Sequence, residues 1–297
     1  MATPRRDAVA RAACRRRGRR DVDARDRPGA GVGGPAKAGE TVTSTGGVPL
    51  RERLDGGVLW LELARPEKKN ALNRPLVEAL HAALDRAELD PLVRVVVVTG
   101  AGADFCAGAD LAELLASADR PTADNEAEAL RLGQLFVRLR ELPKVAVAAV
   151  RGRALAGGAG LATACDLVVA SATASFGYPE VARGFVPAMV MTMLRRAVGE
   201  KVALDLVLTG RVLGAGEAEA RGLVSRVIPE ESFDAELAAL LAQLASRSPT
   251  AIALTKRLLH DLADRSFSEG IVVGAKVNAV ARSTPEFRAL IQGFLRR

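Results

Sequence analysis

The sequence contains few cysteines and few histidines, and both shortages exclude classes of active site. Its three cysteines, Cys14, Cys106 and Cys165, stand far apart and form no Cys-x-x-Cys pair, so neither a disulfide scaffold nor a thiolate zinc site is expected. Its two histidines, His81 and His260, have no nucleophile motif beside them, which argues against a zinc centre and against Ser-His or Cys-His catalysis. We therefore expect no metal ion, acid–base chemistry from carboxylates or backbone groups, and a cytoplasmic location.

Long apolar runs and aromatic residues are also scarce. No apolar run reaches the roughly 18 residues that a membrane-spanning helix requires, so no membrane association is expected. Aromatic residues make up 3% of the chain, with one Trp and one Tyr, which leaves little surface for stacking nucleic-acid bases. Apolar material as a whole is ample, because 49% of the 297 residues are hydrophobic, enough for one large domain or two modest ones.

Positive charge is concentrated at one end of the chain. Residues 1–50 hold 11 Lys or Arg against 5 Asp or Glu, whereas residues 51–297 hold 31 against 30. Residues 1–48 are rich in arginine and glycine and show no periodic apolar face, which predicts a disordered tail. The nearly neutral body predicts no nucleic-acid binding, and the basic tail leaves an RNA-binding arm as an alternative.

Strand and helix signals alternate along the body. β-Branched or alternating apolar residues predict strands at 59–63, 93–99, 145–150 and 167–170, and a helical pattern begins at Pro75. Such alternation is typical of α/β proteins, and we expect one α/β domain over residues 49–245.

The last third of the chain is predicted to be mainly helical. Helical patterns cover 187–198, 202–209, 231–247 and 249–264, and residues 246–297 are expected to form a separate C-terminal helical region. Its end carries one apolar stripe with helical spacing, made of Phe287, Leu290, Ile291, Phe294 and Leu295. A stripe of this strength needs a partner surface, which could be the protein's own pocket or another subunit.

Two loops that follow predicted strands consist largely of small residues: Phe105 to Leu111, and Arg151 to Gly160. Small side chains let a ligand approach the backbone, and a helix that begins near Gly158 adds the positive end of its dipole. One N–H group from each loop could hold a single oxygen as an oxyanion hole. Taken singly, each loop is better explained by a tight turn or close helix–strand packing than by an oxyanion hole. The spacing matches neither a P-loop nor a Gly-x-Gly-x-x-Gly dinucleotide motif.

Short motifs follow one another in a fixed order along the body: Arg65-Pro66, Asn70-Ala71-Leu72, Phe105 to Leu111, Gly152 to Asp166, Phe176 to Glu180, Leu208 to Arg211, Ala220 to Val224 and Ser248-Pro249. With these motifs the chain resembles the enoyl-CoA hydratase/isomerase (crotonase) superfamily over about residues 50–297. The resemblance implies a crotonase-like (ClpP/crotonase) α/β fold: a spiral of ββα units over 49–245, then a helical trimerisation region over 246–297. It also implies a homotrimer or homohexamer.

The resemblance further implies a ligand and the residues that bind it. The ligand is an acyl-CoA thioester whose carbonyl oxygen accepts hydrogen bonds from the N–H groups of Ala109 and Gly157, with Glu180 as the acid–base group. Coenzyme A is part of this substrate, so no separate cofactor is expected. Lys68 and Lys69 are candidate contacts to the CoA phosphates, although adjacent lysines are as often simply solvated. The other candidate substrate-binding residues are Ala71, Ala107, Gly108, Asp110, Leu111, Gly158 and Gly160.

The chain departs from the family pattern at Gly160, where well-studied hydratases carry a second catalytic glutamate. The run from Glu180 to Ala188 is similar to that of hydratases of the leucine-degradation type, which also have glycine at that position. We therefore expect hydration of a 2-enoyl-CoA by a single glutamate. A Δ3-Δ2 enoyl-CoA isomerase is the alternative, followed by a non-catalytic or RNA-binding family member. Asp166 is expected to organise the start of a strand and to take no part in the chemistry.

Overall fold

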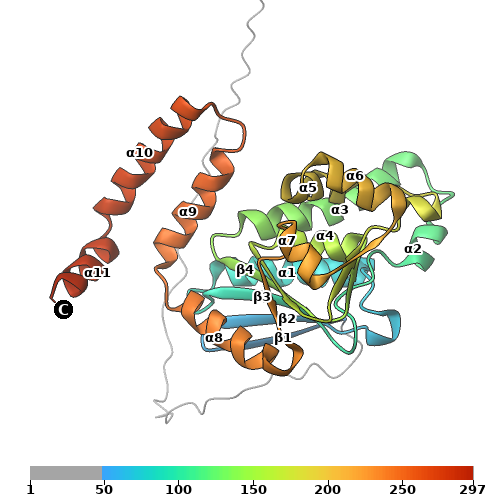
Figure 1. Ribbon diagram of the computed structural model, residues 1–297, viewed down its shortest axis with the longest axis horizontal. Helices are drawn as coiled ribbons and strands as arrows, with labels where there is room; N and C mark the ends of the chain where they lie inside the picture. The colour runs from blue at the N-terminus through green and yellow to red at the C-terminus, as the bar shows by residue number, and fades with distance from the viewer. Residues whose placement is uncertain (1–48, 297) are drawn as a thin grey trace, which may run out of the picture. The chain divides into compact units, whose positions relative to one another are not determined.

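The computed structural model describes residues 49–296, so the expectations for the tail of residues 1–48 lie outside the described part of the chain. These residues form a six-stranded sheet in the order β1-β2-β3-β4-β6-β9 and a three-stranded sheet in the order β5-β7-β8 (Figure 1). The larger sheet is parallel except for the β1–β2 hairpin. The strands are β1 (Leu50–Asp55), β2 (Val58–Leu63), β3 (Val95–Gly100), β4 (Val145–Val150), β5 (Arg153–Leu155), β6 (Leu167–Ser171), β7 (Ser175–Gly177), β8 (Val212–Gly214) and β9 (Arg226–Ile228).

Helices cover both faces of the large sheet, which explains why its central strands are apolar on both sides. Figure 1 shows α8 on one face and α1 with α3 to α6 on the other. The helices of this part are α1 (Arg74–Leu89), α2 (Leu111–Ala116), α3 (Thr122–Glu141), α4 (Gly157–Ala164), α5 (Ala188–Val198), α6 (Glu200–Thr209), α7 (Ala215–Ala220) and α8 (Phe233–Ala245), with 3-10 turns η1 (Pro66–Lys68), η2 (Val181–Arg183) and η3 (Glu230–Ser232).

Strand β3 illustrates the two faces. Its valines are fully buried and alternate between two clusters of the core. Val96 and Val98 belong to the larger cluster, on the side of α1 and α4, whereas Val95 and Val97 pack in the smaller cluster with Phe233 of α8. The period-2 geometry of a strand directs successive side chains to opposite faces. The strand predicted at 93–99 is therefore confirmed as β3, which begins at Val95.

Helix α1 begins where the sequence predicts it. The side chain of Asn73 caps the helix by accepting a hydrogen bond from the N–H of Leu76, and Pro75 occupies its first turn. Leu76, Leu80 and Leu84 are then buried on the face that covers the sheet. This packing positions the loop of residues 65–73, which precedes the helix, at the edge of the candidate site.

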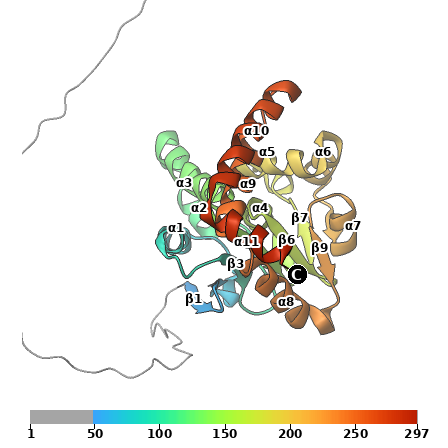
Figure 2. The same cartoon turned by 90° about the vertical axis from the view of Figure 1, so that its left-hand side faces the viewer.

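The C-terminal helices are α9 (Pro249–Asp261), α10 (Phe267–Ser283) and α11 (Pro285–Leu295). Helix α10 packs along α9, and α11 contacts α10 (Figures 1 and 2). Within the described part of the chain, none of the residues in these three helices is buried. Helix α9 contacts the rest of the fold: Ile252 packs against the core cluster that contains Phe233, and Nζ of Lys256 lies 2.7 Å from Oδ2 of Asp166, the residue before β6.

No single helix among residues 49–296 has the length and apolar character needed to cross a membrane. Taken together, Glu230–Ala245 and Pro249–Asp261 would be long and apolar enough to cross a membrane, but the chain bends by 95° between them.

Candidate active site

The two small-residue loops lie against each other at the carboxyl ends of β3 and β4. A β-bridge joins Cys106 to Ala154. The N–H of Cys106 donates to the carbonyl of Arg153 at 3.0 Å, and the N–H of Leu155 donates to the carbonyl of Cys106 at 2.9 Å. A Cβ at Gly158 would collide with the carbonyl group of Cys106, so this approach of the two backbones requires glycine.

The N–H groups of Ala109 and Gly157 belong to backbone segments that this contact brings together. A Cβ at Gly157 would lie 3.7 Å from the amide nitrogen of Ala109, and one at Gly108 would lie 3.2 Å from the amide nitrogen of Gly157. Among the described residues, neither the N–H of Ala109 nor the N–H of Gly157 donates a loop hydrogen bond. Gly157 is also the first residue of α4, where helix geometry leaves the N–H without an intrahelical partner. Two adjacent, unpaired donors are what an oxyanion hole requires.

Ala156, the residue before Gly157, has a backbone conformation that is costly for a residue with a side chain. Its φ is 51° and its ψ is −125°. Its N–H donates to the carbonyl of Gly177 at 2.8 Å, and its carbonyl accepts from the N–H of Gly160 at 3.0 Å. These bonds maintain the strained turn and connect the start of α4 to β7, the strand that leads to Glu180.

Glu180 is a buried carboxyl group at the end of that connection. It is 7% exposed, and its Oε2 has no hydrogen-bond partner among the described residues. Desolvation by burial raises the pKa of Glu180 above its usual value, and the nearby charge of Arg183 only partly opposes this. A carboxyl group with a raised pKa and a free oxygen is suited to accept and return a proton.

Tyr178, two residues before Glu180, is fully buried and its hydroxyl likewise has no hydrogen-bond partner among the described residues. Burial raises the pKa of this phenol, so it remains protonated. Two buried polar atoms that lack a partner, the hydroxyl of Tyr178 and Oε2 of Glu180, thus lie within three residues just after β7, and each could bind water or a polar ligand.

Gly160 lies in α4 and faces apolar side chains. A Cβ at this position would lie 2.8 Å from Cγ2 of Val190 in α5 and 3.3 Å from Cζ of Phe136 in α3. The space beside Gly160 is therefore already filled, and a carboxylate could not be placed there without displacing both neighbours. The resemblance to the family gives two positions for a catalytic glutamate, 160 and 180, and in this chain only position 180 is a glutamate.

Comparison with known proteins decides the family. A family model described as enoyl-CoA hydratase/isomerase matches residues 53–297. The chain belongs to this family. A relative from Thermus thermophilus, named "Putative enoyl-CoA hydratase", is 45% identical over 242 residues, covering 82% of this chain and 96% of the relative. The 2,3-dehydroadipyl-CoA hydratase of Escherichia coli is 35% identical over 241 residues, covering 81% and 92%.

Solved structures confirm the crotonase-like fold. An enoyl-CoA hydratase structure from Mycobacterium smegmatis matches with a TM-score of 0.80 at 29% identity, covering 84% of this chain and 96% of that one. A structure from Legionella pneumophila, described as an enoyl-CoA hydratase/isomerase (crotonase), matches with a TM-score of 0.78 at 31% identity, covering 84% and 96%.

The other predicted substrate-binding residues of this family member occupy different surroundings. Lys68 and Lys69 are exposed, at the end of η1 and just after it, while Ala71 is buried. The carbonyl of Lys69 accepts from the N–H of Ala107 at 2.9 Å. The loop that contains Lys68 and Lys69, the lysine loop, therefore lies beside the first small-residue loop. Gly108 and Gly158 are buried where the loops meet, and Leu111 is exposed at the start of α2. The carboxylate of Asp110 is already engaged, by Arg65 and by the N–H of Ala112.

The side chain of Asn70 supports the site in a way that the sequence did not reveal. It is fully buried; its Nδ2 donates to the carbonyls of Ala101 and Asp104 at 2.9 and 2.8 Å, and its Oδ1 accepts from the N–H of Arg65. Asn70 has a φ of 55°, a left-handed conformation that asparagine tolerates better than most residues. It thus fastens the lysine loop to the loop that follows β3.

A charged pair reinforces the junction of the two small-residue loops. Arg153 binds the carboxylate of Asp104 through two nitrogens, at 2.6 and 2.8 Å. The guanidinium holds the pKa of Asp104 below its usual value, so the pair stays charged. The partners are 49 residues apart in the sequence, and neither residue stands out within its own segment.

Asp166 plays the structural part expected of it. Its Oδ2 accepts from the N–H of Ala146 in β4 at 2.7 Å and forms the ion pair with Lys256. It therefore holds the start of β4 and the approach to β6. Both partners are part of the fold, so Asp166 is a structural residue.

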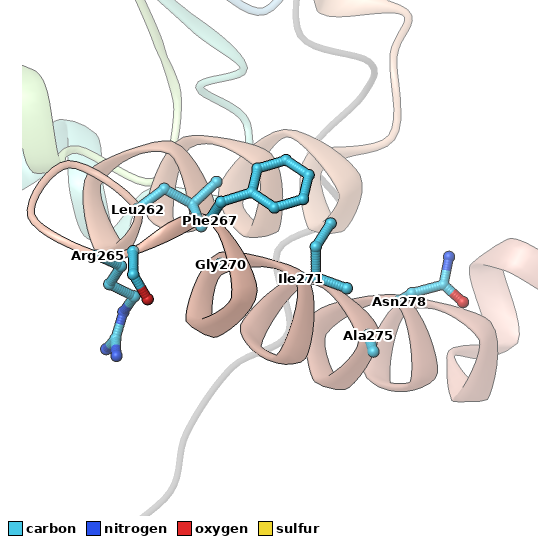
Figure 3. A pocket seen from close by; sticks show the side chains of 9 residues that line it. Leu262, Arg265, Phe267, Gly270, Ile271, Ala275 and Asn278 are labelled. Atoms are coloured by element: carbon cyan, nitrogen blue, oxygen red, sulfur yellow. The ribbon is translucent and has the colours of Figure 1, made fainter.

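A groove formed by the connection after α9 and one side of α10 is distinct from this site. Figure 3 shows Leu262, Phe267 and Ile271 among the side chains that line it. Neither the two N–H groups nor Glu180 borders the groove. It is a feature of the C-terminal helices and not of the candidate active site.

Proposed function

We propose that the protein is an enoyl-CoA hydratase that adds water to a 2-enoyl-CoA thioester. The observation that carries this proposal is the buried carboxyl group of Glu180, which keeps one oxygen free of partners. Glu180 follows β7, and the last residue of that strand, Gly177, accepts a hydrogen bond from the residue before Gly157. The names of the relatives from Thermus thermophilus and Escherichia coli support hydration over other reactions of the family.

In the proposed mechanism, the N–H groups of Ala109 and Gly157 donate to the thioester oxygen. This polarises the conjugated double bond and stabilises the enolate that forms when water attacks C3; each such donor contributes roughly 10²–10³-fold to the rate. Glu180 accepts a proton from the attacking water and delivers a proton to C2, so the net change is addition of H and OH. The mechanism uses no cofactor, because the coenzyme A enters with the substrate.

The raised pKa of Glu180 fits this double role. A carboxylate of ordinary pKa accepts a proton from water only weakly, whereas burial makes protonated Glu180 more stable and the transfer less uphill. The exposed Lys68 and Lys69 are proposed to contact the phosphates of the CoA portion. Their loop is joined to the oxyanion-hole loop through the bond between Ala107 and Lys69.

A Δ3-Δ2 enoyl-CoA isomerase is the second candidate, and the surroundings of Gly160 favour it. Isomerisation needs one carboxylate to move a proton between C2 and C4, and the surroundings of Gly160 are apolar, with Val190 and Phe136 beside it. Two assays separate the candidates. Loss of the conjugated thioester absorbance of crotonyl-CoA supports the hydratase, and appearance of that absorbance from a 3-enoyl-CoA supports the isomerase.

Glu180→Gln tests the acid–base assignment. The amide keeps the shape of the side chain but cannot accept a proton, so turnover should fall by at least about 10³-fold while CoA-thioester binding is nearly unchanged. Glu200→Gln, the same change at an exposed position in α6, is the matched control and should keep wild-type activity. Steady-state rates within a few-fold of wild type for Glu180→Gln would remove Glu180 from the mechanism.

We also propose that the native protein is a homotrimer or a dimer of trimers formed through α9 to α11. The apolar stripe of α11 is exposed within the single chain, and Phe294 is 74% exposed. An amphipathic helix of 11 residues is marginal in water unless its apolar face is covered. Assembly through this face covers the stripe.

A further inference from the structure

The side chain of Arg65 joins the segment around Ala71 to Asp110, the residue that follows the oxyanion-hole residue Ala109. Its Nη1 donates to the carbonyl of Ala71 at 2.5 Å, and its Nη2 donates to Oδ2 of Asp110 at 2.9 Å. The side chains of Arg65 and Asp110 are only 14% and 13% exposed, so this ion pair is largely shielded from water. Shielded ion pairs hold their geometry more firmly than exposed ones, and breaking one by removing a partner is costly.

Backbone hydrogen bonds place this ion pair directly around Ala109. The N–H of Leu72 donates to the carbonyl of Gly108 at 2.7 Å, and the N–H of Asp110 donates to the carbonyl of Leu72 at 3.0 Å. Ala109 is thus the residue between two peptide groups that are both bound to Leu72. Arg65 links Ala71, the neighbour of Leu72, to Asp110, the neighbour of Ala109. It therefore adds a side-chain connection to the backbone hydrogen bonds that hold Ala109.

We propose that Arg65 is a positioning residue for the oxyanion hole: it fixes the direction of the Ala109 N–H and neutralises the carboxylate of Asp110 next to the oxygen that becomes negative. The inference rests on the proposed function, because it assigns Arg65 a role in the same site. Arg65 acts through Ala109 and Asp110, since its donors are already directed at Ala71 and Asp110.

The electrostatic part of this role follows from the position of Asp110. A carboxylate one residue from Ala109, in a site screened from water, repels the negative charge of an enolate oxygen held by that N–H. The hydrogen bond from Arg65 holds the pKa of Asp110 below its usual value, so this carboxylate is ionised at neutral pH. Removing Arg65 alone therefore leaves an uncompensated negative charge beside the hole, whereas removing the charge of Asp110 leaves a positive one that favours the oxyanion.

The structure also separates this role from direct substrate binding by Asp110. Besides the bond to Arg65, the Oδ1 of Asp110 accepts from the N–H of Ala112 as the N-cap of α2. Both carboxylate oxygens are thus occupied within the chain. A binding role predicts that Asp110→Asn raises KM, whereas a positioning role predicts that the effects of Arg65 variants fall on kcat.

The test compares four variants of the full chain on a 2-enoyl-CoA. Arg65→Gln should lower kcat by about 10²-fold at nearly constant KM, the size of effect expected for a misplaced oxyanion donor. Asp110→Asn should keep kcat within tenfold of wild type, since asparagine still caps α2. The double variant should regain at least tenfold in kcat over Arg65→Gln, because no bare carboxylate remains. Arg65→Lys, which keeps the charge, should also stay within tenfold of wild type.

Arg138→Gln is the matched control for loss of an arginine that joins a carbonyl to a carboxylate. Between α1 and α3, Arg138 donates to the carbonyl of His81 at 3.0 Å and to Oδ1 of Asp85 at 2.5 Å. This variant should lower the melting temperature without lowering kcat. Equal kcat losses in Arg65→Gln and Asp110→Asn, or a double variant no faster than Arg65→Gln, would overturn the proposal, because a merely structural pair behaves in that symmetric way.

A second measurement does not depend on turnover. A bound 3-oxoacyl-CoA forms an enolate with its own ultraviolet absorbance, and the enolised fraction reports the strength of the oxyanion hole. Arg65→Gln should reduce this fraction at saturation, and an unchanged fraction would overturn the proposal. A wild-type protein that enolises this ligand but neither hydrates nor isomerises enoyl-CoAs would contradict the proposed function alone. The change in the enolised fraction on Arg65→Gln would then still decide the role of Arg65. If Arg65→Gln does not fold, a loss of 10²-fold or more in the kcat of Asp110→Asn overturns the proposal.

Discussion

The helices that cover the large sheet and the three C-terminal helices have similar apolar content but opposite burial. Helix α1 buries six residues and α8 buries four, whereas α9, α10 and α11 bury none within residues 49–296. Because helices gain most of their stability from packing an apolar face, the first group is stabilised inside the chain. The second group packs only partly on itself and leaves large apolar side chains exposed, among them Phe267, Ile271 and Phe294. Sequence periodicity alone cannot tell these two situations apart.

The largest expected effect comes from charging the exposed stripe. Phe287→Asp together with Phe294→Asp places two carboxylates on the apolar side of α11 and should dissociate the proposed assembly and abolish activity with it. Ala289→Asp with Gln292→Asp adds the same charge on the opposite side of the helix and should leave the assembly intact. Light scattering and activity assays measure both results. An active monomer in the unmutated protein would contradict the idea.

A smaller effect is expected from shortening a buried side chain in the helices that cover the large sheet. Leu84 of α1 is fully buried, and Leu84→Ala should lower the free energy of unfolding by about 2–5 kcal/mol, because it leaves a cavity. Leu89, at the end of the same helix, is 84% exposed, and Leu89→Ala should change the free energy by less than about 0.5 kcal/mol. Denaturant titrations of the two variants measure the contrast. Similar losses would mean that the end of α1 is covered in the native protein.

The smallest effect concerns the connection between the two groups of helices. Nζ of Lys256 pairs with Asp166 at 2.7 Å and donates to the carbonyl of Lys144 at 2.8 Å. Lys256→Met removes both contacts and should cost about 1–3 kcal/mol of unfolding free energy at pH 7. The exposed Lys201→Met is the control and should cost nothing measurable.

The pH dependence of Lys256→Met has a definite sign. Burial raises the pKa of Asp166 in the folded protein above its unfolded value, so the folded state binds this proton more tightly and stability falls as pH rises through the folded pKa. Loss of Lys256 raises that pKa further. The difference in stability from wild type should therefore be larger at pH 7 than at pH 4, and denaturation at both values measures it. A difference that is larger at pH 4 would show that Asp166 is not the responsible group.

Long, regular segments of the fold could be predicted from the sequence. The valine run at 93–99 became β3, and the apolar period after Pro75 became α1. Strand β1 was missed because Leu50–Asp55 is mostly charged and gains its strand conformation by pairing with β2. The three-residue strands β5, β7 and β8 are too short for any periodic signal. Helix α3 was missed because its first half is exposed and only its second half buries residues, namely Leu135, Phe136 and Leu139.

The candidate site could be predicted only in part. The small residues of the two loops and the resemblance to the family pointed to Ala109, Gly157 and Glu180, and the structure brings both loops together. The side chains that hold the loops in place were invisible, because the pairs Arg65–Asp110 and Arg153–Asp104 join residues 45 and 49 positions apart. Such pairs become apparent only when the sheet aligns the ends of β2, β3 and β4.

The tight packing around Gly160 constrains how this site could evolve. Because Val190 and Phe136 occupy the space beside it, a glutamate acquired there by a single mutation would meet a filled and apolar wall. A smaller residue at 190 or 136 would first have to open the space, and that change alone would leave a cavity and lower stability. The order of substitutions therefore matters. The proposed one-carboxylate site is separated from a two-carboxylate site by a step that selection on either mutation alone would oppose.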